Sequence, residues 1–136
     1  MAALARQQDL ADGRTRILEA ALEEFATFGV DGTTLRQIAA RAGTQHQLIV
    51  YHFKSKDALW KAVVAEICGD VRSIILTVER NAKAIGPAKA LRQLVRDFVQ
   101  LTAARPQLHR MLTFEGRSDN ERLLWWISEY VRDFYA

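Results

Sequence analysis

Polar side chains occupy a predicted helix at positions where a helix of the protein interior would carry Leu or Val. Residues 44–47 read Thr-Gln-His-Gln, and Tyr51 and His52 follow one turn later. These residues supply hydrogen-bonding groups and an aromatic ring. The chemistry that such a set favours is recognition of another polar molecule through hydrogen bonds.

Two short helices joined by a glycine turn are expected to position these groups. Thr34 and Gln37 fit a capping box at the start of the first helix. Gly43 follows that helix, where a residue that tolerates positive φ is needed, and Thr44 with Gln47 repeats the capping signature. Two capped helices around a tight turn form the helix-turn-helix pattern, whose second helix enters the major groove of DNA. A plain helical hairpin of the core is the alternative.

A longer stretch carries a more specific signal than either helix alone. Residues 16–43 read RILEAALEEFATFGVDGTTLRQIAARAG, and residues 51–60 read YHFKSKDALW. With both runs in place, the stretch from Thr15 to Val64 resembles the DNA-binding region of TetR-type transcriptional regulators. The resemblance covers this region well and the remainder of the chain only in the order of its helices.

The resemblance implies roles for individual residues. The side chains that would meet base edges are Arg36, Gln45, His46, Gln47 and His52. The side chains that would hold phosphates are Thr34, Tyr51, Lys54 and Lys56. For Tyr51 and His52, membership of the core is the alternative, and for Tyr51 the two interpretations weigh equally.

Three positions depart from the family pattern. Val50 stands where family members commonly carry Tyr, Gln47 where they carry Gly or Pro, and Leu48 where they carry Thr or Ser. Valine cannot donate a hydrogen bond to a phosphate, so that contact is lost or moves to Tyr51.

TetR-type proteins bind palindromic DNA operators as homodimers, and a small molecule in their helical second domain shifts the DNA-binding heads apart. The resemblance therefore implies a ligand-responsive transcriptional regulator, and specifically a repressor. It also implies further helices that form the dimer bundle, so we expect the 136-residue chain to be a fragment of a homodimeric protein. The alternative is a helical interaction module that keeps the fold without sequence-specific DNA binding.

Net charge gives DNA binding no support. The chain has a formal charge of +3, but residues 1–60 hold seven basic and seven acidic side chains. Neutralising phosphates requires local cations, and Arg36, Lys54 and Lys56 stand beside the helix-turn-helix. Glu19, Glu23 and Glu24 lie on the preceding helix and could face away. The arginines of the N-terminal arm could contact the DNA backbone, although a solvated tail is the favoured interpretation; they are Arg6, Arg14 and Arg16.

Helical periodicity predicts an all-α protein in two parts. Residues 1–54 form a three-helix head, whose first helix runs from about Gly13 to Phe28 with Asp12 as its candidate N-cap. The alternative is that the Ala and Leu residues before Asp12 extend this helix. Its expected core is Phe25, Phe28, Leu35, Ile38, Ile49 and Phe53. Residues 55–136 form a partial helical effector-binding and dimerisation domain. It starts with a long helix that Ser55 caps and that reaches about Asn81, followed by helices over residues 87–103, 106–116 and 118–136.

Other chemistry has no constellation of residues behind it. His46, His52 and His109 are too scattered for a metal site, and Cys68 is the only cysteine. No GxSxG, P-loop or GxGxxG motif occurs, so we expect neither an enzyme nor a bound cofactor. The apolar runs are too short for a membrane span and the N-terminus lacks a secretory pattern, which predicts a cytoplasmic protein.

One candidate effector pocket combines apolar side chains with a single polar anchor. Its residues are Met111, Phe114, Glu115 and Trp125. A plain core with Glu115 at its edge is the simpler interpretation, which we favour. Because adjacent helical residues point about 100° apart, Trp125 and Trp126 cannot both face the same core.

Overall fold

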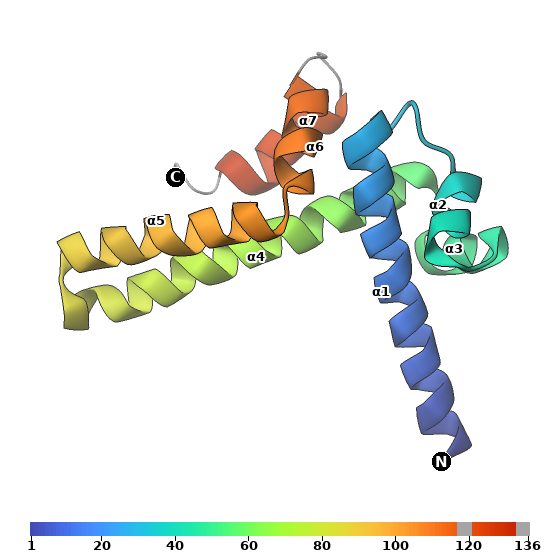
Figure 1. Ribbon diagram of the computed structural model, residues 1–136, viewed down its shortest axis with the longest axis horizontal. Coiled ribbons are helices and arrows are strands. Elements are labelled where there is room, and N and C mark those ends of the chain that lie inside the picture. Colours follow the sequence, from blue (N-terminus) through green and yellow to red (C-terminus); the bar gives the residue numbers. More distant parts are fainter. Residues whose placement is uncertain (117–120, 133–136) are drawn as a thin grey trace. The chain divides into compact units, whose positions relative to one another are not determined.

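A computed structural model describes residues 1–116 and 121–132 (Figure 1). All regular structure in these ranges is helical, which confirms the all-α prediction. The elements are α1 (Ala2–Phe28), α2 (Leu35–Ala42), α3 (His46–Phe53), α4 (Lys56–Ile85), α5 (Pro87–Ala104), α6 (Gln107–Gly116), α7 (Glu121–Trp126) and the π-helical turn η1 (Ile127–Val131). The chain divides into two compact units, Met1–Val63 and Val64–Ala136, and the division falls inside α4.

Helix α1 is longer than predicted. It begins after Met1 and runs without a break through Asp12, so Asp12 is not its N-cap. The reason is composition, because the Ala, Leu, Arg and Gln residues before Asp12 are strong helix formers. Gly13 is buried within the helix, and the Cδ2 atom of Leu48 lies 3.6 Å from the place where a Cβ of Gly13 would stand.

Apolar side chains from all of its helices form the core of the first unit. Fully buried members include Ile17, Phe25, Ile38, Ile49, Leu59 and Trp60. The placement of Phe28 in this core is wrong, because 52% of that residue is exposed. Thr33 is buried instead, and its hydroxyl donates to the carbonyl of Gly29 at 2.7 Å and to that of Glu24 at 3.2 Å. The loop after α1 thus folds back over the end of the helix and leaves Phe28 outside.

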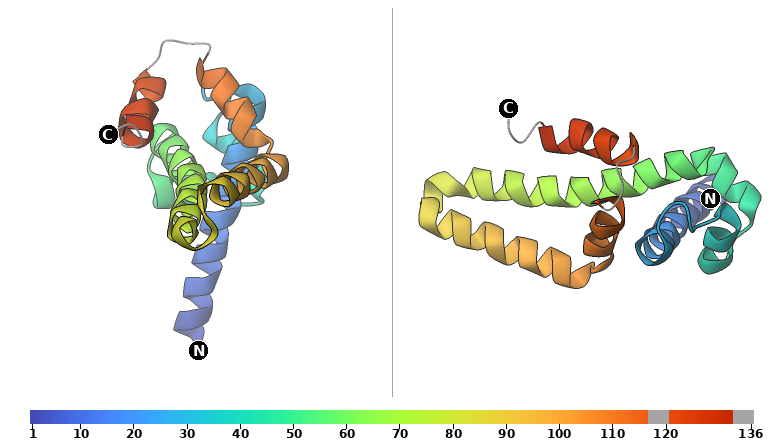
Figure 2. Two further views of the ribbon diagram at one scale, coloured as in Figure 1. Left: turned by 90° about the vertical axis from the view of Figure 1, so that its left-hand side faces the viewer. Right: turned by 90° about the horizontal axis from the view of Figure 1, so that it is seen from above.

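Helix α4 begins as predicted, because the Ser55 hydroxyl accepts a hydrogen bond from the backbone N–H of Ala58 at 3.1 Å. It continues to Ile85, past the predicted end near Asn81, and stops at Gly86 with φ of 84°. In the second unit, α5 runs antiparallel beside α4, as both Figure 1 and Figure 2 show. Arg105 pairs with Asp70 across these helices at 3.2 Å. The predicted cap Ser118 lies outside the described residues.

Among the described residues, no helix combines the length and the apolar character that crossing a bilayer requires.

Candidate nucleic-acid interface

The start of α2 is the capping box that the sequence predicts. The Thr34 hydroxyl accepts from the Gln37 backbone N–H at 3.2 Å, and the Gln37 side-chain oxygen accepts from the Thr34 backbone N–H at 2.8 Å. Both bonds satisfy amides that the first turn of a helix leaves without a partner. The position and direction of α2 are therefore fixed at its first residue.

The turn after α2 is also the predicted one. Gly43 has φ of 66° and ψ of 35°, in the left-handed region. Its N–H donates to the carbonyl of Ala40, and the next N–H, that of Thr44, donates to the carbonyl of Ala39 at 3.0 Å. These paired bonds form a Schellman motif, which needs a residue that tolerates positive φ.

The second predicted capping box does not form. The N-cap of α3 is Gln45, and no side chain caps it, so the pairing of Thr44 with Gln47 is wrong. The physical reason is the preceding turn, which uses the backbone of Thr44 to close α2. Helix α3 consequently begins one residue later, with Gln45, His46 and Gln47 all exposed around its first turn.

Helix α3 has two distinct faces. Ile49 and Phe53 point inward and are 0% and 5% exposed. The opposite face carries Gln47 and Tyr51, and Tyr51 is 65% exposed. Of the two interpretations of Tyr51, the structure supports the solvent-facing one and excludes the core.

His52 lies on neither face cleanly. Its Nε2 atom is enclosed without a hydrogen-bond partner, and its ring packs edge-on against the Tyr51 ring with centroids 5.2 Å apart. Burial lowers the pKa of His52, and the positive charge of Arg14 lowers it further. As placed, this nitrogen cannot reach a base edge, which disfavours the predicted base-reading role of His52.

The cations beside α3 are used in different ways. Arg36 on α2 and Lys54 after α3 are exposed. The Lys56 ammonium donates to the backbone carbonyl of Thr33 at 3.1 Å, which leaves two of its three N–H groups for another acceptor. The guanidinium of Arg14 lies 5.0 Å from the centre of the Phe53 ring, a cation–π contact that joins α1 to the end of α3.

The backbone at Lys54 is strained. Lys54 has φ of 73° and ψ of −48°, and no other described residue except glycine has positive φ. The backbone N–H of Ser55 donates to the carbonyl of Phe53 at 2.9 Å, so Lys54 is the centre of a γ-turn of the rare, strained form. Such strain in a non-glycine residue points to a functional constraint on that side chain.

Glu24 does not face away from the helix-turn-helix, contrary to the sequence-based expectation. It is 6% exposed, and its Oε1 atom accepts from the Nε of Arg41 at 2.7 Å. The pair ties α2 to α1, with one partner buried and the other half-exposed. Arg41 is therefore committed to the fold and not to a phosphate.

The predicted effector residues have different environments in the second unit. Met111 and Glu115 are buried, and the Arg122 Nε lies 3.6 Å from a Glu115 oxygen, so Glu115 is inside the core and not at its edge. Phe114 is 37% exposed. Trp126 is buried while Trp125 is partly exposed, which confirms that the two indoles cannot share one core.

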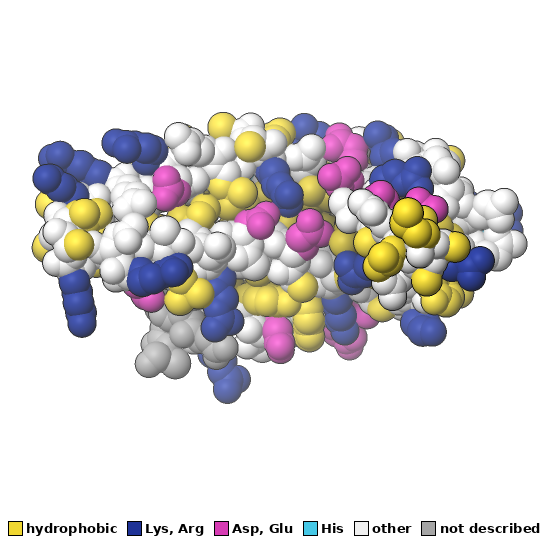
Figure 3. Space-filling model, turned by 90° about the horizontal axis from the view of Figure 1, so that it is seen from below, with side chains coloured by type: hydrophobic (Ala, Val, Ile, Leu, Met, Phe, Trp, Pro, Cys, Tyr) yellow, Lys and Arg dark blue, Asp and Glu magenta, His cyan; other side chains and the backbone are white. Residues whose placement is uncertain are grey.

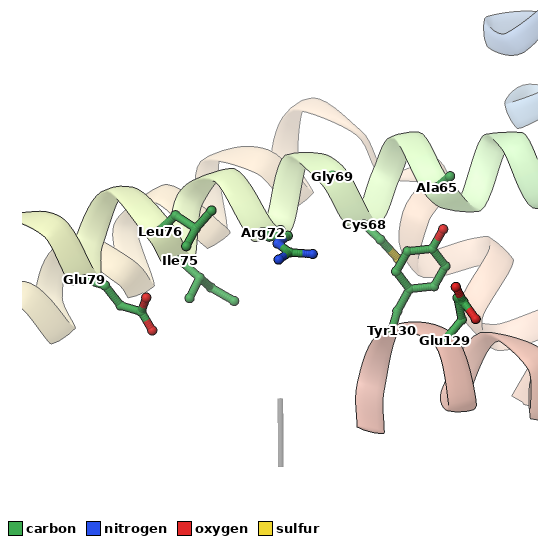
Figure 4. Close-up of a pocket in the computed structure, with 9 residues that line it drawn as sticks. All are labelled: Ala65, Cys68, Gly69, Arg72, Ile75, Leu76, Glu79, Glu129 and Tyr130. Carbon is green, nitrogen blue, oxygen red and sulfur yellow. The ribbon is translucent and has the colours of Figure 1, made fainter. Parts of the chain in front are cut away.

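A groove that the sequence did not predict lies between α4 and η1 (Figure 4). It has a volume of about 410 Å³ and includes none of the four predicted effector residues. Its polar lining residues are Cys68, Arg72, Glu79, Glu129 and Tyr130. The signal that could have found it is the spacing of Cys68, Arg72 and Glu79, which places them along one side of a helix. The π-helical turn, which brings Glu129 and Tyr130 to the groove, has no such signal.

Hydrogen bonding and burial shift the pKa values of two groups in the groove, Cys68 and Tyr130. The Trp126 indole N–H donates to the Cys68 sulfur at 3.3 Å. Burial raises the pKa of the Cys68 thiol, and the bond from Trp126 offsets part of that rise. The pKa of Tyr130 is raised by burial, then by the nearby Cys68 and Glu129. Both groups are therefore neutral at pH 7, and Cys68 has no activated thiolate.

A second hollow, between α4 and α5, is lined only by apolar side chains. Its volume is about 350 Å³, and its residues are Val71, Ile74, Ile75, Leu94, Val95, Phe98 and Val99. Apolar side chains also reach the surface on the face shown in Figure 3, where Lys and Arg are scattered among acidic residues.

Within the described part of the chain, no three His, Cys, Asp or Glu side chains are grouped so that they could hold a metal ion.

Comparison with known proteins accounts for this helix-turn-helix. Residues 17–63 match the model of the bacterial regulatory proteins of the tetR family. The transcriptional regulator RutR of Escherichia coli K12 is 34% identical over 110 residues, which are 81% of this chain and 50% of RutR. The helix-turn-helix region is of the TetR type. RaaS of Mycobacterium tuberculosis, described as an HTH-type transcriptional regulatory protein, is 41% identical over 68 residues, which are 50% of this chain and 31% of RaaS.

Solved structures show the same fold. A mutant of HlyIIR superposes with a TM-score of 0.78 at 22% identity, over 93% of this chain and 67% of that one. A regulator from Mesorhizobium loti, described as a putative TetR-family protein, gives 0.59 at 27% identity, over 90% of this chain and 68% of that one. The chain spans about half the length of the curated relatives it matches.

Proposed function

We propose that this chain contains the DNA-binding head and part of the effector-binding domain of a ligand-responsive repressor. The observation that carries the proposal is α3, a helix that exposes Gln47 and Tyr51, anchors its opposite face in the core and has its entry turn fixed by Gly43. RutR and BetI, which match more than four-fifths of the chain, are both named as helix-turn-helix transcriptional regulators.

The first turn of α3 supplies the base-reading groups in this proposal. Gln45, His46 and Gln47 are exposed there, and recognition helices read base edges with their N-terminal residues. A Gln side chain can pair with both the N6 and N7 atoms of adenine. Arg36, exposed on α2, would reach the edge of the same groove.

Phosphate contacts would come from residues on either side of α3. Thr34 and Tyr51 are exposed and carry hydroxyl groups, and Lys54 and Lys56 supply positive charge. Tyr51 is well placed to replace the phenol that the family commonly carries at position 50, because it is exposed one residue later on the same helix. The full-length protein would be a homodimer on a palindromic operator, since two-fold symmetric proteins bind half-sites related by the same symmetry.

The effector would occupy the groove between α4 and η1. Groups that donate and accept hydrogen bonds line it, namely Arg72, Glu129 and Tyr130, together with Glu79, Cys68 and apolar residues of α4. A groove of this size with a mixed polar and apolar lining suits a polar small molecule. Small molecules that raise the melting temperature should lose that effect in Tyr130→Phe and Arg72→Ala and keep it in Leu112→Ala, whose residue is exposed outside the groove.

Salt dependence of DNA binding tests the proposal against the alternative of an interaction module. Duplexes are selected from a random pool, and their affinity is measured by fluorescence anisotropy between about 50 and about 200 mM salt. We expect tighter binding to selected than to random duplexes, and a steep loss of affinity with salt. Gln100→Ala, at an exposed site on α5, is the matched control for Gln47→Ala and should bind like the unchanged chain. Affinity that is absent or indifferent to salt would support the interaction module.

A further inference from the structure

The first three turns of α1 have no structural role in the head. Residues 2–12, the α1 extension, are helical and exposed throughout. Figure 1 and Figure 2 both show this part of α1 without another helix of the first unit beside it. Eleven residues at 1.5 Å each extend about 16 Å. A rigid helix of this length, with nothing packed on it, is available for contact with another molecule.

Contacts along α1 show on which side of α3 the extension emerges. Helix α2 is tied to α1 at Glu24 through Arg41. Helix α3 meets α1 at Gly13 and Arg14, about 16 Å closer to the N-terminus. The extension continues in the same direction, so it passes α3 on the side away from α2. In a helix-turn-helix the second helix, here α3, is the one that lies in the major groove, so the extension emerges beside the helix nearest the DNA.

Helix α3 crosses α1 steeply and does not run along it. Leu48 and Phe53 are about 7.5 Å apart along α3, yet they contact adjacent residues of α1, Gly13 and Arg14. A helix with its side chains is about 10–12 Å thick, so α3 covers roughly 5–6 Å of α1 on each side of Gly13. Arg6 lies about 10 Å from Gly13 along the axis, just past the outer edge of α3.

The helical register turns Arg6 toward α3. Arg6 and Gly13 are seven residues apart and therefore within about 20° of each other around the helix, and Gly13 is the residue that faces Leu48. Leu48 borders the exposed face of α3, because Tyr51 lies only about 60° from it around α3. Arg6 thus stands beside the face of α3 that carries Tyr51.

The extension carries one basic and two acidic side chains. Arg6 is its one Lys or Arg. Its two acids, Asp9 and Asp12, line a shallow surface hollow together with Thr15 and Arg16. At 100° per residue, Asp9 and Asp12 are turned about 60° and 120° away from Arg6. Asp9, four residues before Gly13, is turned only about 40° from it, so the side toward α3 carries Asp9 as well as Arg6, and only Asp12 is turned well away.

We propose that Arg6 is a DNA backbone ligand that extends the α3 interface onto α1. This inference rests on the proposed function. A duplex that admits α3 into a major groove about 12 Å wide has phosphates along both rims of that groove. The Arg6 guanidinium would bind one such phosphate, with two parallel N–H donors available for its oxygens. The contact fixes position and adds affinity without reading sequence.

The test moves the positive charge around the helix without changing composition. Arg6→Gln removes the cation, and Arg6→Gln combined with Gln8→Arg returns it about 160° away from the α3 side. Arg and Gln have similar helix propensities, so the helicity of α1 should not change in either protein. Arg6→Lys keeps the charge in place. Binding to selected and to random duplexes is measured for all four proteins across the same salt series.

We expect Arg6→Gln to reduce the slope of log affinity against log salt by about 0.9, equally for both classes of duplex. The slope of the double variant should stay reduced, and the slope of Arg6→Lys should be close to that of the unchanged chain. An unchanged slope in Arg6→Gln, or full recovery in the double variant, would overturn the role of Arg6. If selective binding through Gln47 persists in that case, the proposed function stands; if the unchanged chain shows no salt-dependent binding, both fall together.

Discussion

The two turns that bound α3 solve the same backbone problem with different residues. Both need positive φ, 66° at Gly43 before the helix and 73° at Lys54 after it. Glycine adopts that conformation without a steric penalty, whereas lysine is strained there. The first turn is therefore optimised for stability, and the second keeps an exposed cation at a cost in stability. The difference suggests that the turn after α3 is constrained by what Lys54 contacts.

The largest expected effect comes from the pair that holds α2 against α1. Arg41→Ala would leave the carboxylate of Glu24 buried without its cation, and breaking a fully buried pair costs about 3–5 kcal/mol. Because 44% of the Arg41 side chain is exposed, we expect a smaller loss, about 2 kcal/mol, in urea unfolding. An Arg41→Ala protein as stable as the original would show that Glu24 is satisfied by other groups.

Gly43→Ala tests the first turn. Nothing lies within 4 Å of the place a Cβ would take, so any loss of stability comes from φ alone. A left-handed conformation costs a non-glycine residue about 1–2 kcal/mol. The melting temperature and the DNA affinity should fall together, because a shifted turn would misdirect α3. Unchanged melting would mean that the turn can rearrange at no cost.

Lys54→Gly tests the second turn and, unlike Gly43→Ala, should raise the stability of the protein. Relief of strain should raise stability by about 1 kcal/mol, while loss of one cation should reduce the salt slope of DNA binding by about one unit. Lys54→Gln, which keeps the strain and removes the charge, separates the two effects. A Lys54→Gly protein that is less stable would refute the contrast between the turns.

The two Thr-x-x-Gln sequences give a matched comparison of caps. Thr34→Ala removes a side-chain cap that is present and should cost about 1 kcal/mol. Thr44→Ala removes none and should stay within about 0.5 kcal/mol of the original. Thermal or urea unfolding of both variants measures the difference, and equal losses would show that Thr44 contributes to the start of α3 after all.

The smallest effect concerns pH. Burial and Arg14 lower the pKa of His52 in the folded protein, so the unfolded chain binds a proton more readily. Stability should therefore be complete above the ordinary pKa of 6.5 and decline as pH falls from there toward the lowered value. In His52→Gln, the loss of stability in this pH range should be smaller. A loss of the same size as in the original protein would show that other groups cause it.

Local signals were enough to predict α2, Gly43 and the inward face of α3. Their determinants lie within one or two turns of chain, as the Thr34–Gln37 box does. Predictions failed where two signals competed: Thr44 serves the turn that ends α2, and the helix formers before Asp12 override its capping signal. They also failed where distant residues decide, since burial of Glu24 depends on Arg41, seventeen residues away.

The candidate interface shows the same limits. Residue types and spacing indicated the exposed residues Gln45, His46 and Gln47 at the start of α3. They could not indicate that His52 Nε2 is enclosed or that Lys54 is the centre of a γ-turn, because both depend on how α3 packs against α1 and α2. The groove at Tyr130 depends on a π-helical turn, a conformation that no local pattern predicts.

The most direct test of the central claim is the base preference of α3, measured with single-base variants of a selected duplex. The account predicts that Gln47→Ala loses about 1–3 kcal/mol of discrimination at one base pair and little elsewhere, as expected for a side chain that reads a base edge. Lys54→Gln should weaken all duplexes by the same factor. If Gln47→Ala also weakened every duplex by one factor and left the base preferences unchanged, the exposed face of α3 would not be a reading surface, and the central claim would be contradicted.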